Sequence, residues 1–368
     1  MHASQHDAAF RFFDNREKYL LFATTCSEKK QTARRISAEL ERLMPKPPMM
    51  TMFQAGSGEG TLLNRVLREL HLRWPTVPLV AVVKENSAEF VRMAVRNLAD
   101  RFREHPQLVL IFTNLPIGDT PTLGARVAGD GLNWRSVALT GTSSHGFDRQ
   151  IIRELEFVDH GWPGGGYGNS VMVLYRQDHA FSMHRVIPEP GFGRFEFDLI
   201  VCSQAYRSRL PASIKVKWLL APLAESLAPG GRMLVAQSTG RDPGMEIIHA
   251  VWPEENPFAT PREILLEALE QRVGPSRSDL VFEDPPGGQS EYRFELQLNP
   301  EDIDSNIGTS TLLAAWNAAT YVAQIDDSRV TEAMSGGRYM KATEEVLSKH
   351  KGLWFLNECF VVSRTPPE

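Results

Sequence analysis

Three glycines in the pattern Gly-x-Gly-x-Gly, at Gly56, Gly58 and Gly60, are the residues of this 368-residue chain with the clearest chemical use. An apolar run at residues 49–53 precedes them, and residues 61–70 follow with the apolar spacing of a helix. A tight turn from strand to helix favours glycine because a Cβ atom resists its backbone angles. The turn also brings the free N–H groups of the helix N-terminus close to a ligand. The pattern favours a site for a nucleotide-type cofactor; the alternative is an ordinary strand-to-helix turn.

Acidic and amide side chains follow the next two apolar runs. Residues 79–83 have the continuous apolar character of a strand buried on both faces, and Glu85 comes just after them. Glu85 lies about 25 residues past the glycines, near the spacing at which an acid binds ribose hydroxyls in nucleotide-binding folds. The alternative is an exposed acid in a loop. The third strand is expected at 108–114, so that Asn114 ends it and Leu115 begins the loop at the edge of the sheet where ligands bind.

A fourth strand, residues 197–203, is followed by polar groups that suit a second substrate. Ser203 ends the strand, and Tyr206, Arg207 and Arg209 come directly after it. The planar fork of an arginine binds a carboxylate well. The alternative for these residues is a solvated loop.

An acid and a base lie three residues apart in the helical segment 244–252. Glu246 and His249 therefore share one helix face, as acid–base chemistry requires. A polar helix surface is the alternative. Trp252 ends this segment and is a candidate for contact with a substrate.

Two further segments carry candidate substrate contacts. The small-residue helix expected at 308–321 presents Trp316 and Asn317, which could equally pack in the core. His145 stands in a polar stretch after the strand expected at 136–142.

These residues must be positioned by a larger framework. We expect a helical N-terminal cap at 1–48, rich in aromatic residues, that ends at the prolines before the glycine strand. A cofactor-binding core follows at 49–240, with an insertion at about 143–190 that fits no simple sheet. A helical substrate or lid region is expected at 241–350, and the last strand of the core sheet at 351–368.

The composition, with 42% hydrophobic and 23% charged residues, is that of an ordinary soluble globular protein. The net charge of −5 and a pI near 6.1 argue against a general nucleic-acid or membrane-surface binder. Three distant cysteines without a CxxC pair argue against a metal site or a disulfide framework. The N-terminus lacks the features of a signal peptide, and no apolar run is long enough for a membrane span, so we expect a cytoplasmic protein. A homodimer is compatible with these properties, but the sequence leaves the oligomeric state open.

The order of these motifs resembles the Rossmann-like class I methyltransferases that use S-adenosylmethionine. The resemblance rests on residues 55–60, the acid at Glu85, and segments 197–201, 227–234 and 355–362. It implies an α/β fold with a mostly parallel sheet, an antiparallel last strand and S-adenosylmethionine as cofactor. The cofactor contacts expected from it are Gln54, Ala55, Gly56, Gly58, Gly60, Glu85, Asn114, Leu115 and Ser203. Tyr206, His249 and Glu246 are the candidate catalytic residues. The candidate substrate contacts are Arg207, Arg209, Trp252, Trp316, Asn317 and His145.

The chain departs from that family at one position. Gln54 stands two residues before the first glycine, where the family often has an acid; an amide can hydrogen-bond the amino group of the cofactor but cannot pair with it ionically. A weaker resemblance links segments 114–119 and 230–234 to the SABATH family, which methylates carboxylates and ring nitrogens of small molecules. The aromatic pair of that family after the fourth strand is not reproduced; Tyr206 is followed there by Arg207.

The sequence therefore predicts an enzyme that transfers a methyl group to oxygen or nitrogen of a small molecule, with a carboxylate as one candidate acceptor. Such an enzyme mainly positions the reactants and excludes water, and needs a general base only for some acceptors. Two alternatives stay open: an NAD(P)-dependent oxidoreductase on a Rossmann sheet, and a non-catalytic module that keeps the sheet. The Pro-Gly-Gly turn at 229–231 and the expected last strand disfavour the oxidoreductase.

Overall fold

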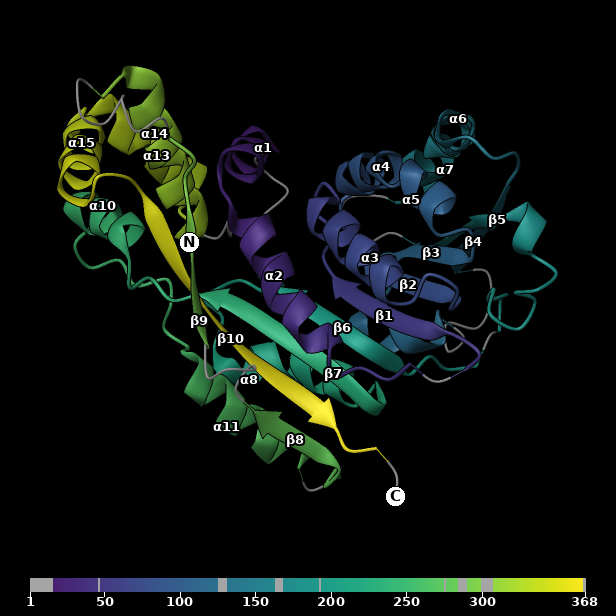
Figure 1. Ribbon diagram of the computed structural model, residues 1–368. Coiled ribbons are helices and arrows are strands. Elements are labelled where there is room, and N and C mark those ends of the chain that lie inside the picture. Colours follow the sequence, from purple (N-terminus) through teal and green to yellow (C-terminus); the bar gives the residue numbers. More distant parts are fainter. Residues whose placement is uncertain are drawn as a thin grey trace, which may run out of the picture.

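A ten-stranded sheet runs through the molecule and separates two layers of helices (Figure 1). The computed structural model describes residues 16–45, 47–124, 131–162, 168–191, 193–274, 276–283, 290–298 and 307–366. The strands are β1 (Met50–Ala55), β2 (Leu79–Lys84), β3 (Leu108–Thr113), β4 (Leu132–Leu139), β5 (Asn169–Arg176), β6 (Phe197–Ser203), β7 (Leu227–Ser238), β8 (Leu280–Glu283), β9 (Glu291–Glu295) and β10 (Trp354–Arg364).

The helices differ in length from single turns to 14 residues. They are α1 (Arg16–Thr25), α2 (Glu28–Leu40), α3 (Thr61–Arg73), α4 (Ala88–Asn97), α5 (Ala99–Glu104), α6 (Ser144–Arg153), α7 (Leu155–Gly161), α8 (Ala212–Lys215), α9 (Ala221–Ala224), α10 (Pro243–Val251), α11 (Arg262–Val273), α13 (Thr309–Val322), α14 (Asp327–Ser335) and α15 (Arg338–His350). Single-turn or irregular helices are η1 (Ile117–Thr122), η2 (Gln177–His179) and η3 (Val216–Leu220).

The strand order is β4-β5-β3-β2-β1-β6-β7-β10-β8, with β9 pairing to β10. Strands β3, β2, β1, β6 and β7 pair in parallel, and β10 is antiparallel to β7. The chain thus moves outward from β1 to β3 and then returns to the other side of β1 at β6. This reversal leaves a crevice at the carboxyl ends of β1 and β6, where open α/β sheets bind ligands. The expected α/β fold with a mostly parallel sheet and an antiparallel last strand is confirmed.

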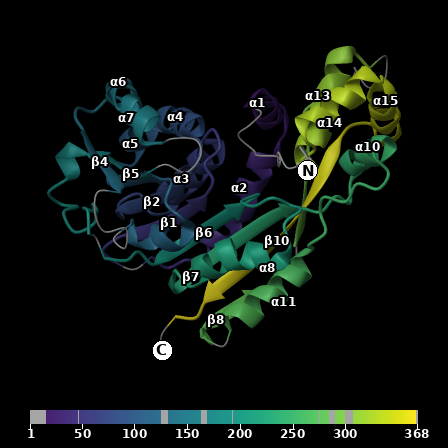
Figure 2. The ribbon, with the colours of Figure 1, turned by 180° about the vertical axis from the view of Figure 1, so that it is seen from behind.

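The central strands are buried on both faces, as their continuous apolar sequences predict. Every residue of β1 and β3 is buried. Met52 faces a core shared with α2 to α7, while its neighbour Phe53 faces a second core formed with η3, α9 and α11. Figure 2 shows α8 and α11 on the side of the sheet opposite to α2.

A third core joins α1 to the carboxyl-terminal helices. Tyr19 and Phe22 of α1 pack with Tyr321 of α13 and Phe355 of β10 in this core, which also includes α10 and α15. In Figure 1, α1 lies between this helical group and the helices that cover β1 to β3. The expected N-terminal cap therefore bridges two parts of the molecule.

Two expected regions have a different structure from the one that the sequence predicts. The segment that fits no simple sheet contains α6, α7 and β5, and β5 extends the sheet by pairing antiparallel to β3. The region 241–350, expected to be a helical lid, also contains β8, which pairs with β10 at the far edge of the sheet, and α11, which packs in the second core. Strands β8 and β9 both pair with β10, a contact between segments far apart in the sequence that no local pattern predicts.

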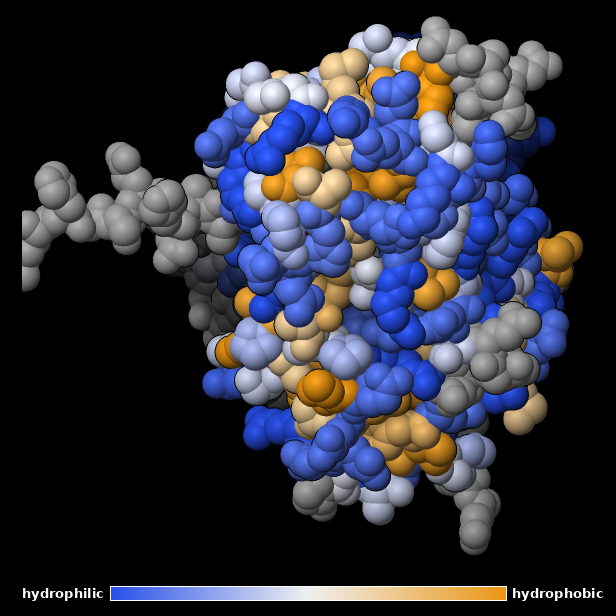
Figure 3. Space-filling view, turned by 90° about the vertical axis from the view of Figure 1, so that its left-hand side faces the viewer, coloured by the Kyte–Doolittle hydropathy of each residue, from blue (hydrophilic) through white to orange (hydrophobic). Residues whose placement is uncertain are grey.

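The surface over the carboxyl-terminal helices is mostly hydrophilic, with apolar residues scattered in small groups (Figure 3). Among the described residues, every helix is too short or too polar to cross a bilayer.

Candidate active site

A cavity of about 430 Å³ opens at the carboxyl ends of β1, β2 and β6. Its size is within the range of small-molecule and cofactor sites. The lining residues come from the glycine turn, the ends and following loops of these strands, and the surrounding helices: Tyr19, Lys29, Gln54, Ala55, Gly56, Ser57, Gly58, Leu62, Lys84, Glu85, Asn86, Phe90, Ile117, Ser203, Gln204, Ala205, Arg207, Leu219 and Tyr321.

The three glycines of the turn have different structural roles. All have a positive φ, which side chains other than glycine rarely adopt. A Cβ atom at Gly56 would meet nothing within 4 Å, so the cavity reaches this backbone directly. A Cβ atom at Gly60 would lie 2.8 Å from the Cα of Ala94, so Gly60 allows α3 and α4 to pack closely.

Tyr19 of α1 lies over the middle glycine. A Cβ atom at Gly58 would lie 2.0 Å from the Tyr19 hydroxyl. That hydroxyl donates to the carboxylate of Glu59 and accepts from the Glu59 N–H at 3.2 Å. Helix α1 is thereby fixed to the glycine turn and forms one wall of the cavity.

Glu85 holds the turn from the opposite side. Its Oε2 accepts from the N–H groups of Ser57 at 3.0 Å and Gly58 at 3.3 Å, and from the Ser57 hydroxyl at 3.2 Å. Its Oε1 accepts from the N–H groups of Asn86 at 2.8 Å and Ser87 at 3.0 Å. This one carboxylate therefore orders both the glycine turn and the start of α4.

Gln54 offers an unused acceptor at the start of the turn. Its Nε2 donates to the carbonyl of Gly56 at 2.9 Å, while its buried Oε1 has no hydrogen-bond partner among the described residues. A buried acceptor without a partner costs free energy until a donor reaches it. An ammonium or hydroxyl of a ligand would fill this need.

Lys84 stands beside Glu85 at the end of β2. Burial lowers the pKa of the Lys84 ammonium to about 8, although the carboxylate of Glu85 opposes this shift. Its Nζ donates to the carbonyl of Asn114 at 2.8 Å and to the side chain of Asn86.

A buried ion pair from α2 reaches the opposite end of the cavity. Lys29 Nζ lies 2.9 Å from Glu28 Oε2, and Glu28 Oε1 accepts from the hydroxyls of Thr32 at 3.2 Å and Ser203 at 3.4 Å. Burial alone would lower the pKa of Lys29, but the carboxylates of Glu28 and Glu59 outweigh it and raise this pKa. The Lys29 ammonium is therefore charged near neutral pH.

A narrow extension of about 30 Å³ continues from this end. It shares Lys29, Gln204 and Tyr321 with the main cavity and adds Glu28 and Phe294. This end combines aromatic walls with charged and amide groups, so it can hold a small polar molecule.

Seven of the predicted site residues line the main cavity. These are Gln54, Ala55, Gly56, Gly58, Glu85, Ser203 and Arg207. Arg207 is half-buried, and its side chain has no ion-pair or hydrogen-bond partner among the described residues, so its guanidinium is free to bind an anion.

The loop after β6 directs its other polar residues elsewhere. The Tyr206 hydroxyl donates to Gln237 at 2.8 Å in the core, and burial raises its pKa well above the ordinary value. Arg209 donates to the carbonyls of Ala323 and Gln324 at 2.9 Å and pairs with Glu255 at 2.5 Å. Tyr206 and Arg209 therefore tie the loop to its neighbours and lie outside the cavity.

The pair expected on one helix face also lies outside the cavity. Glu246 pairs with Lys349 at 2.8 Å and His350 at 3.0 Å, which joins α10 to α15. The Nε2 of His249 lies 2.9 Å from the carbonyl of Glu255. Both residues lie on α10, as the spacing predicts, but their side chains contact α15 and the backbone of Glu255 and do not reach the cavity.

The tryptophans and Asn317 have packing roles in this structure. Trp316 stacks on Trp252 with ring centroids 5.6 Å apart and is only 2% exposed. The Nδ2 of Asn317 donates to the carbonyl of Lys18 at 3.0 Å, which joins α13 to α1. None of the three lines the cavity.

The remaining candidates also lie away from the cavity. Asn114 bonds to the backbone of Gly168 at 3.1 Å and Ser170 at 2.7 Å, and Leu115 is fully buried. His145 is exposed at the start of α6. Gly60, described above, serves helix packing.

Sequence reasoning missed the walls contributed by other helices. Tyr19, Lys29, Phe90 and Tyr321 reach the cavity from α1, α2, α4 and α13. The aromatic N-terminal segment was one signal for Tyr19. No local motif identifies Lys29, Phe90 or Tyr321 as lining residues, because only tertiary contacts bring them to the glycine turn.

No protein-family model matches the chain, and no curated protein matches it either. Among solved structures, it is similar to a sarcosine dimethylglycine methyltransferase candidate from Galdieria sulphuraria, with 7% identity, a TM-score of 0.37 and coverage of 91% of this chain and 86% of that chain. A geranyl diphosphate methyltransferase in complex with SAM gives 14% identity, a TM-score of 0.32 and coverage of 99% and 97%. A third is Phospholethanolamine N-methyltransferase 2 from Haemonchus contortus, in complex with phosphomonomethylethanolamine and S-adenosylhomocysteine. It has 13% identity, a TM-score of 0.34 and coverage of 98% of this chain and 61% of that chain. At TM-scores this low, the fold assignment depends on the strand order described above.

Proposed function

We propose that this protein is an S-adenosylmethionine-dependent methyltransferase that acts on a small molecule. The observation that supports this most strongly is the cavity at the glycine turn, where Gly56 leaves its backbone open and Glu85 and Gln54 flank it. The mostly parallel sheet with an antiparallel last strand, β10 beside β7, also supports the proposal, because the resemblance implies both features.

Residues at the glycine turn fit the polar groups of this cofactor. Glu85 is the candidate for the ribose hydroxyls, and the partnerless Oε1 of Gln54 is the candidate for the amino group. Because Glu85 already accepts five hydrogen bonds, ribose hydroxyls would compete with the weaker of these, such as the one from Gly58. Phe90 and Ile117 supply apolar walls for a flat ring.

The end of the cavity near α2 fits an acceptor molecule. When bound, S-adenosylmethionine supplies an electrophilic methyl group, so the protein has to orient the acceptor and exclude water. Glu28 is held close to Ser203 and can accept a proton or a hydrogen bond from an acceptor hydroxyl or amine. Arg207 can bind an acceptor carboxylate with its free guanidinium. Tyr19 and Tyr321 cover this end and keep water out.

Equilibrium binding of S-adenosylmethionine and of NAD, each measured by calorimetry on the same preparation, tests the proposal. We expect saturable binding of S-adenosylmethionine and S-adenosylhomocysteine, and no comparable binding of NAD. Preference for NAD would favour the oxidoreductase, and absence of binding by both would favour the non-catalytic module; each result would reject the proposal.

A further inference from the structure

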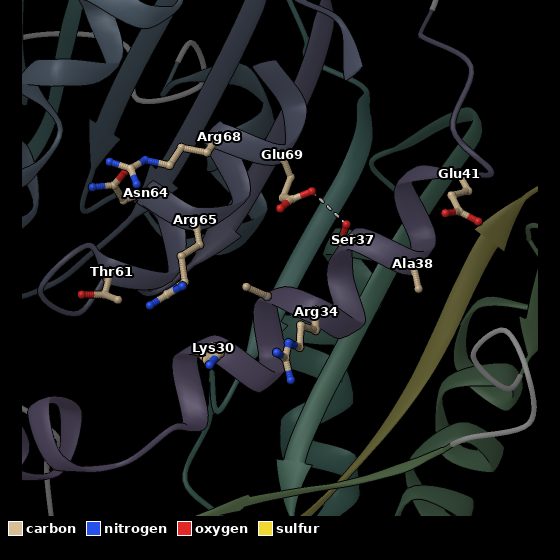
Figure 4. Close-up of a pocket in the computed structure, with 11 residues that line it drawn as sticks. Lys30, Arg34, Ser37, Ala38, Glu41, Thr61, Asn64, Arg65, Arg68 and Glu69 are labelled. Carbon is tan, nitrogen blue, oxygen red and sulfur yellow. Dashed lines mark hydrogen bonds between the residues drawn. The ribbon is translucent and has the colours of Figure 1, made fainter. Parts of the chain in front are cut away.

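A second, larger hollow lies on the surface between α2 and α3. It has a volume of about 630 Å³ and is lined by residues of these two helices and by Glu41, which follows α2 (Figure 4). We call it the α2–α3 groove. It shares no lining residue with the cofactor cavity, although Lys30 and Thr61 of the groove are sequence neighbours of Lys29 and Leu62 of the cavity.

Four cations gather at one end of the α2–α3 groove. Lys30 and Arg34 come from α2, and Arg65 and Arg68 come from α3; all four are exposed. Lys30, Arg65 and Arg68 have no ion-pair or hydrogen-bond partner among the described residues, and Arg34 donates only to the amide oxygen of Gln31 at 3.2 Å. This local excess of positive charge stands in a chain whose net charge is −5.

Two acids mark the other end and are already engaged. Glu69 accepts from the Ser37 hydroxyl at 3.1 Å, as the dashed line in Figure 4 shows. Glu41 pairs with Arg73 at 3.4 Å. Neither acid is within ion-pair distance of the four cations among the described contacts, so the positive charges are not neutralised by the groove itself.

A buried polar atom adds a second observation. The Oδ1 of Asn64 is buried without a hydrogen-bond partner, while its Nδ2 donates to the carbonyl of Asn97 at 3.1 Å. Asn64 lies beside Arg68 in Figure 4. A ligand that carries a hydroxyl or a protonated group beside its anionic groups would provide the missing donor.

We infer that the α2–α3 groove binds a compact small molecule with two or more phosphate groups. Arginine forks and a lysine ammonium bind phosphate oxygens through charge-assisted hydrogen bonds. Along each helix, the residues that carry the cations are three or four positions apart, about 4.5 to 6 Å at a rise of about 1.5 Å per residue, so their exposed side chains can reach neighbouring phosphates of one molecule. The acids at the far end would repel a polyanion that ran the whole length of the groove, so the site favours a short oligophosphate over a nucleic-acid strand.

Inorganic tripolyphosphate is the probe that tests this inference, measured by calorimetry at low ionic strength on the full-length protein. We expect saturable binding that the double variant Arg65→Glu/Arg68→Glu weakens at least about tenfold. The double variant Lys30→Glu/Arg34→Glu provides an independent test from the other helix. The control Arg149→Glu/Arg153→Glu changes the net charge equally on α6, where both arginines are exposed, and should leave the affinity unchanged.

Titrations with other ligands show whether the phosphates belong to a nucleotide or to a simple phosphate chain. Tighter binding of ATP than of tripolyphosphate would support a nucleotide ligand, and equal binding would support recognition of the phosphates alone. The inference would be overturned by no saturable binding by the wild type, by equal losses in the groove and control variants, or by tighter binding of a short oligothymidylate. Because S-adenosylmethionine binding is measured separately, failure of this site would leave the proposed function untouched. Competition between tripolyphosphate and S-adenosylmethionine would place the anion in the cofactor cavity and also overturn the inference.

Discussion

The carboxylate of Glu85 connects the glycine turn to the cofactor that we propose. It accepts hydrogen bonds from Ser57 and Gly58 on one side and from Asn86 and Ser87 on the other. A hydrogen bond to a charged group contributes about 1.5–3 kcal/mol, and about 1.4 kcal/mol corresponds to a tenfold change in affinity.

Replacing this carboxylate is the first prediction. Glu85→Ala should weaken binding of S-adenosylmethionine at least about tenfold, because both the ribose contact and the order of the turn are lost. The exposed Glu254→Ala serves as the control for the loss of one acid. If calorimetry shows a loss below about twofold, the ribose contact must be assigned to another residue.

Sequence spacing identifies some of the residues that line the cavity and not others. Gly56 and Glu85, which the sequence singles out, both line the cavity, because the geometry of a tight turn and of a strand end is set locally. Tyr206 and Glu246 lie outside the cavity lining, because their directions depend on partners such as Gln237 and Lys349, which no local pattern identifies.

At the scale of elements, α1 is the part that closes the cavity. Tyr19 contacts Glu59 at the glycine turn, and the backbone of Lys18 accepts from Asn317 of α13. These contacts join segments up to 299 residues apart. For this reason the sequence predicted the sheet and its helices, but it could not predict that α1, α2 and α13 would form the walls of the site.

Closure by α1 leads to a prediction about hydrogen exchange. Adding S-adenosylmethionine should slow amide exchange in residues 16–25, because a ligand against Tyr19 removes local openings of this helix. Helix α11, on the opposite face of the sheet, is the internal control and should not change. Equal exchange in α1 with and without a bound cofactor would show that this helix is no part of the site.

At the scale of the whole molecule, a buried histidine links stability to pH. His105 is 4% exposed; its Nε2 lies 2.9 Å from the carbonyl of Val77 and its Nδ1 lies 3.0 Å from the Nδ1 of His71. Burial, with a smaller contribution from His71, lowers the pKa of His105 to about 4. The unfolded chain takes up this proton near pH 6.5, so the folded protein is fully stabilised above that pH and loses stability as the pH falls toward 4.

The size of this effect can be measured. Denaturant unfolding should show the free energy of unfolding falling between pH 6.5 and 4, with at most about 3 kcal/mol of the loss due to this residue. His105→Gln should have a flatter pH dependence over this range, whatever its stability at pH 7. An unchanged slope in the variant would mean that other groups cause the pH dependence.

The central claim is that the glycine turn holds S-adenosylmethionine against an open backbone. Two glycines allow a matched test: Gly56 and Gly141 share a φ of +85°, and a Cβ atom at either position would meet nothing within 4 Å. Only Gly56 lines the cavity. Replacement by valine should therefore impose similar backbone strain, about 1–2 kcal/mol, at both positions but fill the cavity at only one.

The decisive measurement is calorimetric titration of S-adenosylmethionine into the wild type, Gly56→Val and Gly141→Val, with thermal unfolding of all three recorded in the absence of ligand. We predict similar losses of stability in the two variants, unchanged affinity in Gly141→Val and at least about tenfold weaker binding in Gly56→Val. Equal affinity of Gly56→Val and the wild type, or a wild type that does not bind S-adenosylmethionine, would contradict the account.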